Sequence, residues 1–168
     1  LQAPTSQEAR VLSNRGALFL KQDRPRRALR ALERAVELAP GLPDAHFNLG
    51  LVRARLGRHA EASAAFERAA QLGLEHADFD VAYGVSLRAQ NRYAQAAAAF
   101  SRAVARAPLR ADLHLQQGEA LRAMGQLDTA LTAFDRAVQL DSTLGAAHRF
   151  RGELLAASGR HEEAVAAY

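Results

Sequence analysis

The chain has 168 residues, a net charge of +4 and 49% apolar residues, with only 6% aromatic residues. This composition supports a folded core, in which alanine and leucine must supply most of the packing, and it argues against disorder. The absence of cysteine excludes a disulfide scaffold, a zinc finger, an iron–sulfur site and a cysteine nucleophile. It leaves the compartment open between cytoplasm and periplasm, and no apolar run reaches the roughly 20 residues that cross a bilayer.

Small and aromatic residues recur at a fixed interval of 34 residues. The glycines of this series are Gly16, Gly50, Gly84, Gly118 and Gly152. Alanine follows the same interval in two series, and a large apolar residue stands between them: Ala28, Ala62, Ala96, Ala130 and Ala164; Leu32, Phe66, Phe100, Phe134 and Tyr168; Ala35, Ala69, Ala103 and Ala137. A fixed period of this length identifies an array of repeats.

Each repeat is predicted to be a pair of helices. In residues 43–76, Pro43 and Asp44 open the first helix, and apolar residues follow at helical spacing. Gly57 marks a turn before the second helix, and the turn-forming residues Asp23, Asn91, Gly125 and Gly159 stand at the same phase of the other repeats. We expect the glycine and alanine to lie where the paired helices cross, and the large residue to fill the space between successive hairpins.

These residues resemble the tetratricopeptide repeat (TPR), a 34-residue helix pair with a characteristic glycine, two alanines and an aromatic residue. The resemblance covers residues 9–42, 43–76, 77–110, 111–144 and a partial repeat at 145–168, as a single array over residues 1–168. It implies an all-α solenoid, a right-handed superhelix of antiparallel hairpins. The last repeat stops inside its second helix without a polar capping helix, so we expect either a fragment or a tail that is disordered. The preference for arginine over lysine, of which Lys21 is the single example, is typical of a GC-rich bacterial gene.

The resemblance further implies that the first helices line a concave groove that holds a peptide or a segment of a partner protein. Carried over position by position, the groove residues are Asn14, Lys21, Phe47, Asn48, Leu51, Arg55, Val81, Val85, Arg88, Leu115, Gln116, Glu119 and Arg122. The amides among them can donate and accept, and would hold a peptide backbone whatever its side chains; the alternative is a solvated polar surface. The recurrent cations would favour an acidic peptide; the alternative is stabilisation of helix C-termini.

Other charged and titratable residues are better explained by structure. Asp44, Asp78 and Asp112 begin first helices, where a negative side chain is favourable; the alternative is contact with a basic partner segment. Histidines at equivalent positions of different repeats lie too far apart to share a metal ion. We therefore predict no metal, no cofactor and no catalytic residue.

The preferred interpretation is a protein–protein interaction scaffold and not an enzyme. Two alternatives remain open: the substrate-recognition arm of a larger enzyme of the glycosyltransferase or sulfotransferase kind, and an assembly or secretion factor of the cell envelope. The expected second helix of the first repeat is rich in arginine, with Arg24, Arg26, Arg27, Arg30 and Arg34, and no aromatic residue lies between these arginines, which disfavours nucleic acid. Residues 9–42 carry a net charge of +5 and residues 111–144 a net charge of −3, so homo-oligomerisation through the uncapped ends is also open.

Overall fold

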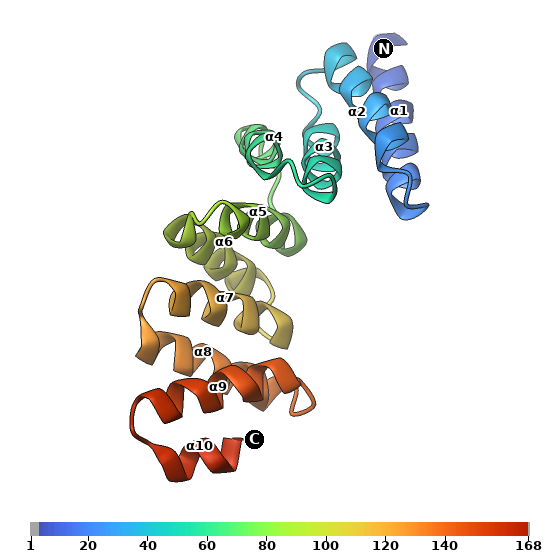
Figure 1. The fold of residues 1–168 in the computed structure, drawn as a ribbon. Helices are drawn as coiled ribbons and strands as arrows, with labels where there is room; N and C mark the ends of the chain where they lie inside the picture. Colours follow the sequence, from blue (N-terminus) through green and yellow to red (C-terminus); the bar gives the residue numbers. More distant parts are fainter. Residues whose placement is uncertain (1–3, 168) are drawn as a thin grey trace. The chain divides into compact units, whose positions relative to one another are not determined.

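The computed structural model describes residues 4–167, and every regular element in that range is a helix (Figure 1). In chain order the helices are α1 (Pro4–Lys21), α2 (Pro25–Leu38), α3 (Pro43–Arg55), α4 (His59–Gln71), α5 (Ala77–Ala89), α6 (Tyr93–Arg106), α7 (Ala111–Ala123), α8 (Leu127–Leu140), α9 (Gly145–Ala157) and α10 (His161–Ala167). Helices α3, α5, α7 and α9 each begin at the first residue of an expected repeat. The predicted all-α class is confirmed; Tyr168, expected in the large apolar series, lies outside the described residues.

The chain divides into two compact units, residues 1–90 and 91–168. In the first unit, α1 packs on α2 and α3 on α4 as hairpins, while α2 lies against α3 and α4 against α5. Helix α3 also contacts both α1 and α5, so the first helices of successive hairpins lie side by side. In the second unit, α7 pairs with α8 and α9 with α10, and α6 and α8 pack on the helices that follow them.

The turns predicted from the repeat phase have the backbone conformation that their residues favour. Gly57, Gly125 and Gly159 adopt φ values of 75–76°, and the equivalent Asp23 and Asn91 adopt 55° and 60°. Aspartate and asparagine tolerate this left-handed region better than other residues with a side chain. The shared phase therefore reflects one turn geometry used at every repeat.

The periodic glycines allow the two helices of a hairpin to approach closely. A Cβ atom on Gly16 would lie 2.5 Å from Cγ of Leu32, and one on Gly118 would lie 2.5 Å from Cε1 of Phe134. Both distances are far below the 3.5–4.0 Å of a favourable carbon–carbon contact. The expected helix crossing at the glycine is therefore present, with the large residue of the second helix packed directly against it.

The same aromatic residues also reach the next hairpin. The Phe66 ring centroid lies 6.1 Å from that of Phe79 on α5, and the Phe134 centroid lies 5.4 Å from that of Phe150 on α9. The sequence predicted only this second role. Each ring thus fills the interior of its own hairpin and the boundary with the following one.

We predict that Gly118→Ala destabilises the protein. The new methyl group would overlap the buried Phe134 ring, and overpacking of this kind costs about 1–3 kcal/mol, more than the helix propensity gained by alanine. The free energy of unfolding from urea denaturation measures the effect. Gly145→Ala on α9 is the control, because a Cβ there meets no atom within 4 Å. Equal stability of the two variants would contradict the close approach.

Candidate functional site

The candidate surface of the first unit is carried by α1, α3 and α5, which lie side by side. These three helices carry the predicted groove residues Asn14, Lys21, Phe47, Asn48, Leu51, Arg55, Val81, Val85 and Arg88. Their repeat positions suggested one continuous lining. The structure gives them very different exposures and partners, so they do not contribute equally to a binding surface.

A polar hollow of about 370 Å³ lies between α1 and the start of α3. Its lining combines the exposed amide of Asn14 with a cation, an anion, a hydroxyl and an apolar side chain, from Arg10, Asp44, Ser13 and Leu42. Of these, only Asn14 was predicted as a groove residue. Arg10 lies one helical turn before Asn14 on α1, and this spacing was the signal that could have identified it.

The amide of Asn48 is already engaged with the neighbouring helix. Its Nδ2 atom donates a hydrogen bond of 3.3 Å to Oγ of Ser13, whose side chain is buried. The bond joins α3 to α1 and places Asn48 beside the hollow that Asn14 lines. Asn48 therefore helps to fix the position of α3 relative to α1. Asn14 has the more exposed amide of the two asparagines.

Phe47 lies in an aromatic cluster between α3, α4 and α5. Its ring centroid is 5.1 Å from that of His76 and 6.0 Å from those of Phe66 and Phe79. His76 in turn caps α5, because its Nδ1 atom accepts a 3.0 Å hydrogen bond from the backbone N–H of Phe79. Leu51, also half-buried, packs against the same core. Phe47 thus serves mainly as a packing residue, with only part of its surface open to a ligand.

The cations of the first unit do not form a uniform stripe. Arg55 donates a 2.8 Å hydrogen bond to the carboxylate of Asp23 in the α1–α2 turn, and both side chains are exposed. Lys21 is exposed, whereas Arg88, Val81 and Val85 are half-buried. The charge of Arg55 is therefore partly offset by a neighbour within the same protein.

In the second unit, the predicted residues of α7 again differ in exposure. Leu115 exposes only 8% of its surface and packs with Phe134 and Phe150 in the core. Gln116 is half-buried, and its Oε1 atom is fully buried without a hydrogen-bond partner among the described residues. Glu119 is also half-buried. Of these three residues, Gln116 has the polar atom that a ligand could satisfy.

Arg122 lies beside an aromatic side chain and a carboxylate of α9. Its guanidinium carbon is 4.7 Å from the Phe150 ring centroid, and that of Arg149 is 4.2 Å from the same centroid. Glu153 is 3.7 Å from Arg122 and 3.2 Å from Arg149. Two arginines therefore share one carboxylate and one aromatic ring, which leaves the cluster with excess positive charge.

The three histidines at the same repeat position in first helices have backbone partners. The Nε2 atoms of His46, His114 and His148 each donate a hydrogen bond of 2.9–3.0 Å to the carbonyl oxygen six residues earlier, in the loop before the helix. Within residues 4–167, no group of three or more potential metal ligands comes together. No helix in that range is long and apolar enough to span a membrane.

The aspartates expected at helix starts lie in the first turns of α3, α5 and α7. In the last case, the Arg110 guanidinium donates hydrogen bonds of 3.2 and 2.8 Å to the two carboxylate oxygens of Asp112. These bonds, together with the charge of Arg110, hold the pKa of Asp112 below its usual value. This supports the structural interpretation of Asp112, because its charge already has a partner.

The tetratricopeptide repeat model matches residues 14–77, 81–144 and 115–168. A search of the curated proteins finds no significant match. Among solved structures, YrrB, described as a TPR protein with an unusual peptide-binding site, has a TM-score of 0.86 at 26% identity over 93% of this chain and 80% of its own. MamA (41-end) from Desulfovibrio magneticus RS-1 has a TM-score of 0.88 at 24% identity over 99% of this chain and 93% of its own. These matches confirm the all-α repeat solenoid that the resemblance to the tetratricopeptide repeat implied.

We predict that Asp112→Asn lowers the free energy of unfolding at pH 7 by about 0.3–1 kcal/mol, because it removes a charge from the first turn of α7. The folded-state pKa of Asp112 is depressed, so its contribution is present above the unfolded-state pKa and is lost as pH falls through the folded value. Urea denaturation should therefore separate variant and parent at pH 7 but not well below pH ~4. A difference that persists in acid would contradict this electrostatic role.

Proposed function

The chain belongs to the tetratricopeptide repeat family and is a protein-interaction scaffold, and from this premise we propose that it binds a peptide segment of a partner along α1, α3 and α5. The observation that carries the proposal is the polar hollow between α1 and α3. A peptide backbone presents N–H donors and C=O acceptors in alternation, and Asn14 offers both complementary groups. Arg10 and Asp44 at the same hollow supply one charge of each sign for the peptide side chains.

The rigidity of this surface favours peptide binding. The Asn48–Ser13 hydrogen bond and the aromatic cluster around Phe47 hold the three helices in place before any ligand arrives. A preformed surface confines the entropic cost of ordering to the peptide. The residues that proved to be packing residues thus contribute to binding indirectly, by positioning Asn14.

In the second unit, α7 offers an independent contact. The buried Oε1 atom of Gln116 lacks a donor, and a buried acceptor without a partner costs about 1–3 kcal/mol. A peptide N–H would reach this oxygen after the half-buried Gln116 side chain turns outward, and the hydrogen bond would then recover that cost. We propose that Gln116 binds the peptide backbone in the second unit as Asn14 does in the first.

We predict that Asn14→Leu weakens peptide binding by about 1 kcal/mol or more, roughly fivefold in Kd, because it removes a hydrogen-bonding amide. The measurement is isothermal titration calorimetry with a peptide selected from a random library on the parent protein. The control is Gln139→Leu on α8, an exposed amide of the second unit that lines no described hollow. Equal affinity of parent and Asn14→Leu would show that the hollow is not the binding site.

A second proposal is that copies of this chain associate end to end. Val11 and Leu18 on α1 are 60% and 52% exposed, whereas the equivalent Ala45 and Val52 of the next repeat are fully buried. In the last hairpin, Val165 on α10 is 78% exposed. Its equivalent one repeat earlier, Leu131, packs against a core cluster.

The exposed apolar residues of α1 and of α10 are suited to pack against each other. Within the chain, the second helix of one hairpin packs on the first helix of the next, as α8 packs on α9. Helix α10 of one copy could receive α1 of another in the same manner, and the opposite net charges of residues 9–42 and 111–144 would favour the encounter. The contact would be head to tail.

We predict that the sedimentation-derived mass of the parent rises with protein concentration and that Leu18→Gln abolishes this rise, because it places a polar group at the apolar contact. Leu109→Gln is the control, since Leu109 is 76% exposed but lies in the loop before α7. A parent that stays monomeric at every concentration would rule out the end-to-end contact.

A further inference from the structure

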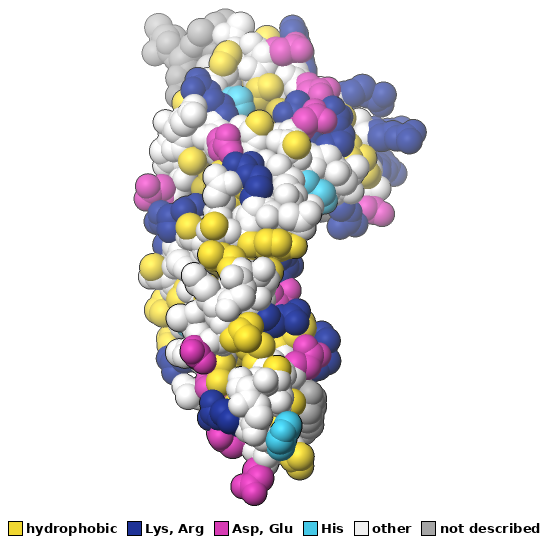
Figure 2. Space-filling view, turned by 60° about the vertical axis from the view of Figure 1, so that its left-hand side comes forward, with side chains coloured by type: hydrophobic (Ala, Val, Ile, Leu, Met, Phe, Trp, Pro, Cys, Tyr) yellow, Lys and Arg dark blue, Asp and Glu magenta, His cyan; other side chains and the backbone are white. Residues whose placement is uncertain are grey.

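We infer that the α1–α2 hairpin carries a second binding surface, for an acidic polypeptide segment, formed by Arg15, Arg24, Arg26, Arg27 and Arg30. This arginine surface lies on the α1–α2 turn, the exposed side of α2 and the adjoining part of α1. It shares no residue with the hollow around Asn14, so it goes beyond the peptide site proposed above. In the space-filling view, Lys and Arg side chains gather over this part of the molecule at the upper right (Figure 2).

The acidic residues of the α1–α2 turn and of α2 pair with arginines outside this surface. Asp23 pairs with Arg55 at 2.8 Å, Glu33 lies 3.9 Å from Arg53, and Glu37 pairs with Arg34 at 3.0 Å. None of the five arginines of the surface has a described ion-pair partner among residues 4–167. Arg15 alone among them has a described side-chain interaction, a cation–π contact of 5.4 Å with Phe19. Five exposed arginines of one hairpin thus have no described ion-pair partner within the protein.

Other hairpins show how the same turn is neutralised. Arg58 and Arg160 occupy the position of Arg24, and each donates two hydrogen bonds to the glutamate three residues later: 2.6 and 2.5 Å to Glu61, 2.7 and 2.6 Å to Glu163. In the first hairpin the residue three positions after Arg24 is Arg27. In the third hairpin, Arg92 donates a 2.6 Å hydrogen bond to the neutral Gln95 at that position. The first hairpin therefore has a second cation where the second and fifth hairpins have a carboxylate and the third has an amide.

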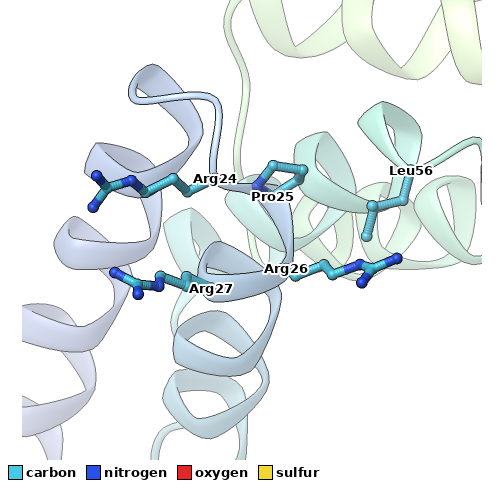
Figure 3. Close-up of a pocket in the computed structure, with 5 residues that line it drawn as sticks. All are labelled: Arg24, Pro25, Arg26, Arg27 and Leu56. Carbon is cyan, nitrogen blue, oxygen red and sulfur yellow. The ribbon is translucent and has the colours of Figure 1, made fainter.

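The arginine side chains border two adjoining hollows that share Arg27. Figure 3 shows Arg24 and Arg27 extended side by side toward α1, while Arg26 points the other way, toward Leu56. One hollow, of about 480 Å³, is mostly apolar and is lined by Pro25 and Leu56 together with the stems of the arginines. The other, of about 230 Å³, lies between Arg15, Phe19, Arg27 and Arg30.

This combination fits a polypeptide in which carboxylates flank an apolar side chain. Guanidinium groups pair with carboxylates in a two-bond fork, as Arg58 does with Glu61. The apolar hollow beside Leu56 would receive the apolar side chain. Single-stranded nucleic acid would need exposed rings for base stacking, and the one ring here, Phe19, is half-buried beneath Arg15. A bilayer surface would not enter a hollow, and the exposed Val11 and Leu18 line neither one.

Charge reversal at Arg27 tests the inference. The probe is a fluorescently labelled peptide with a leucine between two runs of glutamate, and its reference is the same peptide with glutamine in place of each glutamate. Arg27→Glu recreates the pair seen at Arg58 and Glu61, so the variant should fold and melt no earlier than the parent. We expect it to bind the acidic peptide about tenfold more weakly or worse, because charge-assisted hydrogen bonds are lost.

Two control variants are needed. One distinguishes an effect of this surface from an effect of net charge, and the other distinguishes this surface from the proposed peptide site at Asn14. Arg136→Glu on α8 makes the same change in net charge at an exposed arginine whose described side-chain partner is Gln139, and it should bind like the parent. Asn14→Leu should also retain the acidic peptide, so that failure of either proposal is seen separately.

Several outcomes would overturn the inference. If Arg27→Glu and Arg136→Glu weaken binding of the acidic peptide equally, the effect is one of net charge alone. If the parent binds the glutamine peptide as tightly as the acidic peptide, the carboxylates have no role. Unlabelled acidic peptide, oligodeoxythymidine and phosphatidylserine vesicles are compared as competitors. If the oligonucleotide or the vesicles displace the labelled peptide better than the unlabelled peptide does, the surface binds nucleic acid or membranes instead.

Discussion

The close approach of paired helices at a glycine is the contact on which the rest of this structure depends. Most of the helices have only 13 or 14 residues, a length at which an isolated helix is marginally stable in water. Their stability must come from packing. The glycine lets a large side chain of the partner helix lie directly on the backbone, and the same side chain then contacts the following hairpin, as Phe134 does with Phe150. In the second and fourth repeats, one aromatic residue therefore holds its own hairpin together and joins it to the next.

This packing leaves the remaining positions free to differ between repeats. The helix faces that carry Gly50, Ala62 and Phe66 are committed to the core, and the turn position is restricted to glycine, aspartate or asparagine by its backbone angles. No such restriction applies to the exposed ends of helices or to the outer side of α2. Binding chemistry can vary there without cost to the fold, and the polar hollow at Asn14 and the arginine surface both lie at such positions.

The sequence predicted the helices, their turns and the helix crossings well, because each depends on residues within one repeat. It predicted the exposure of individual side chains less well. Phe47 and Leu115 have groove positions by the family resemblance, yet both pack against core residues, because burial of a large apolar side chain is favourable. The Arg55–Asp23 pair joins residues 32 positions apart in two repeats, and no spacing within a repeat reveals it. Arg10 was missed because the family positions did not include it.

A difference between repeats points to a binding role when one member of an ion pair is replaced and the other member is kept. At the turn before the second helix, the fourth repeat has Gln126 and Thr129 where the second has Arg58 and Glu61. Both members of that pair have become neutral, so no charge is left over, and the Thr129 hydroxyl instead donates to the backbone carbonyl of Gln126 at 3.1 Å. The third repeat keeps the arginine, Arg92, and pairs it with a neutral amide, Gln95, at 2.6 Å. In the first repeat, the arginine is present and the carboxylate position carries a second arginine. Drift between neutral residues would not concentrate like charges at one turn, where their mutual repulsion opposes folding. An anion from outside the chain would relieve that repulsion, and for this reason the first hairpin, more than any other part of the array, has the electrostatics of a binding surface.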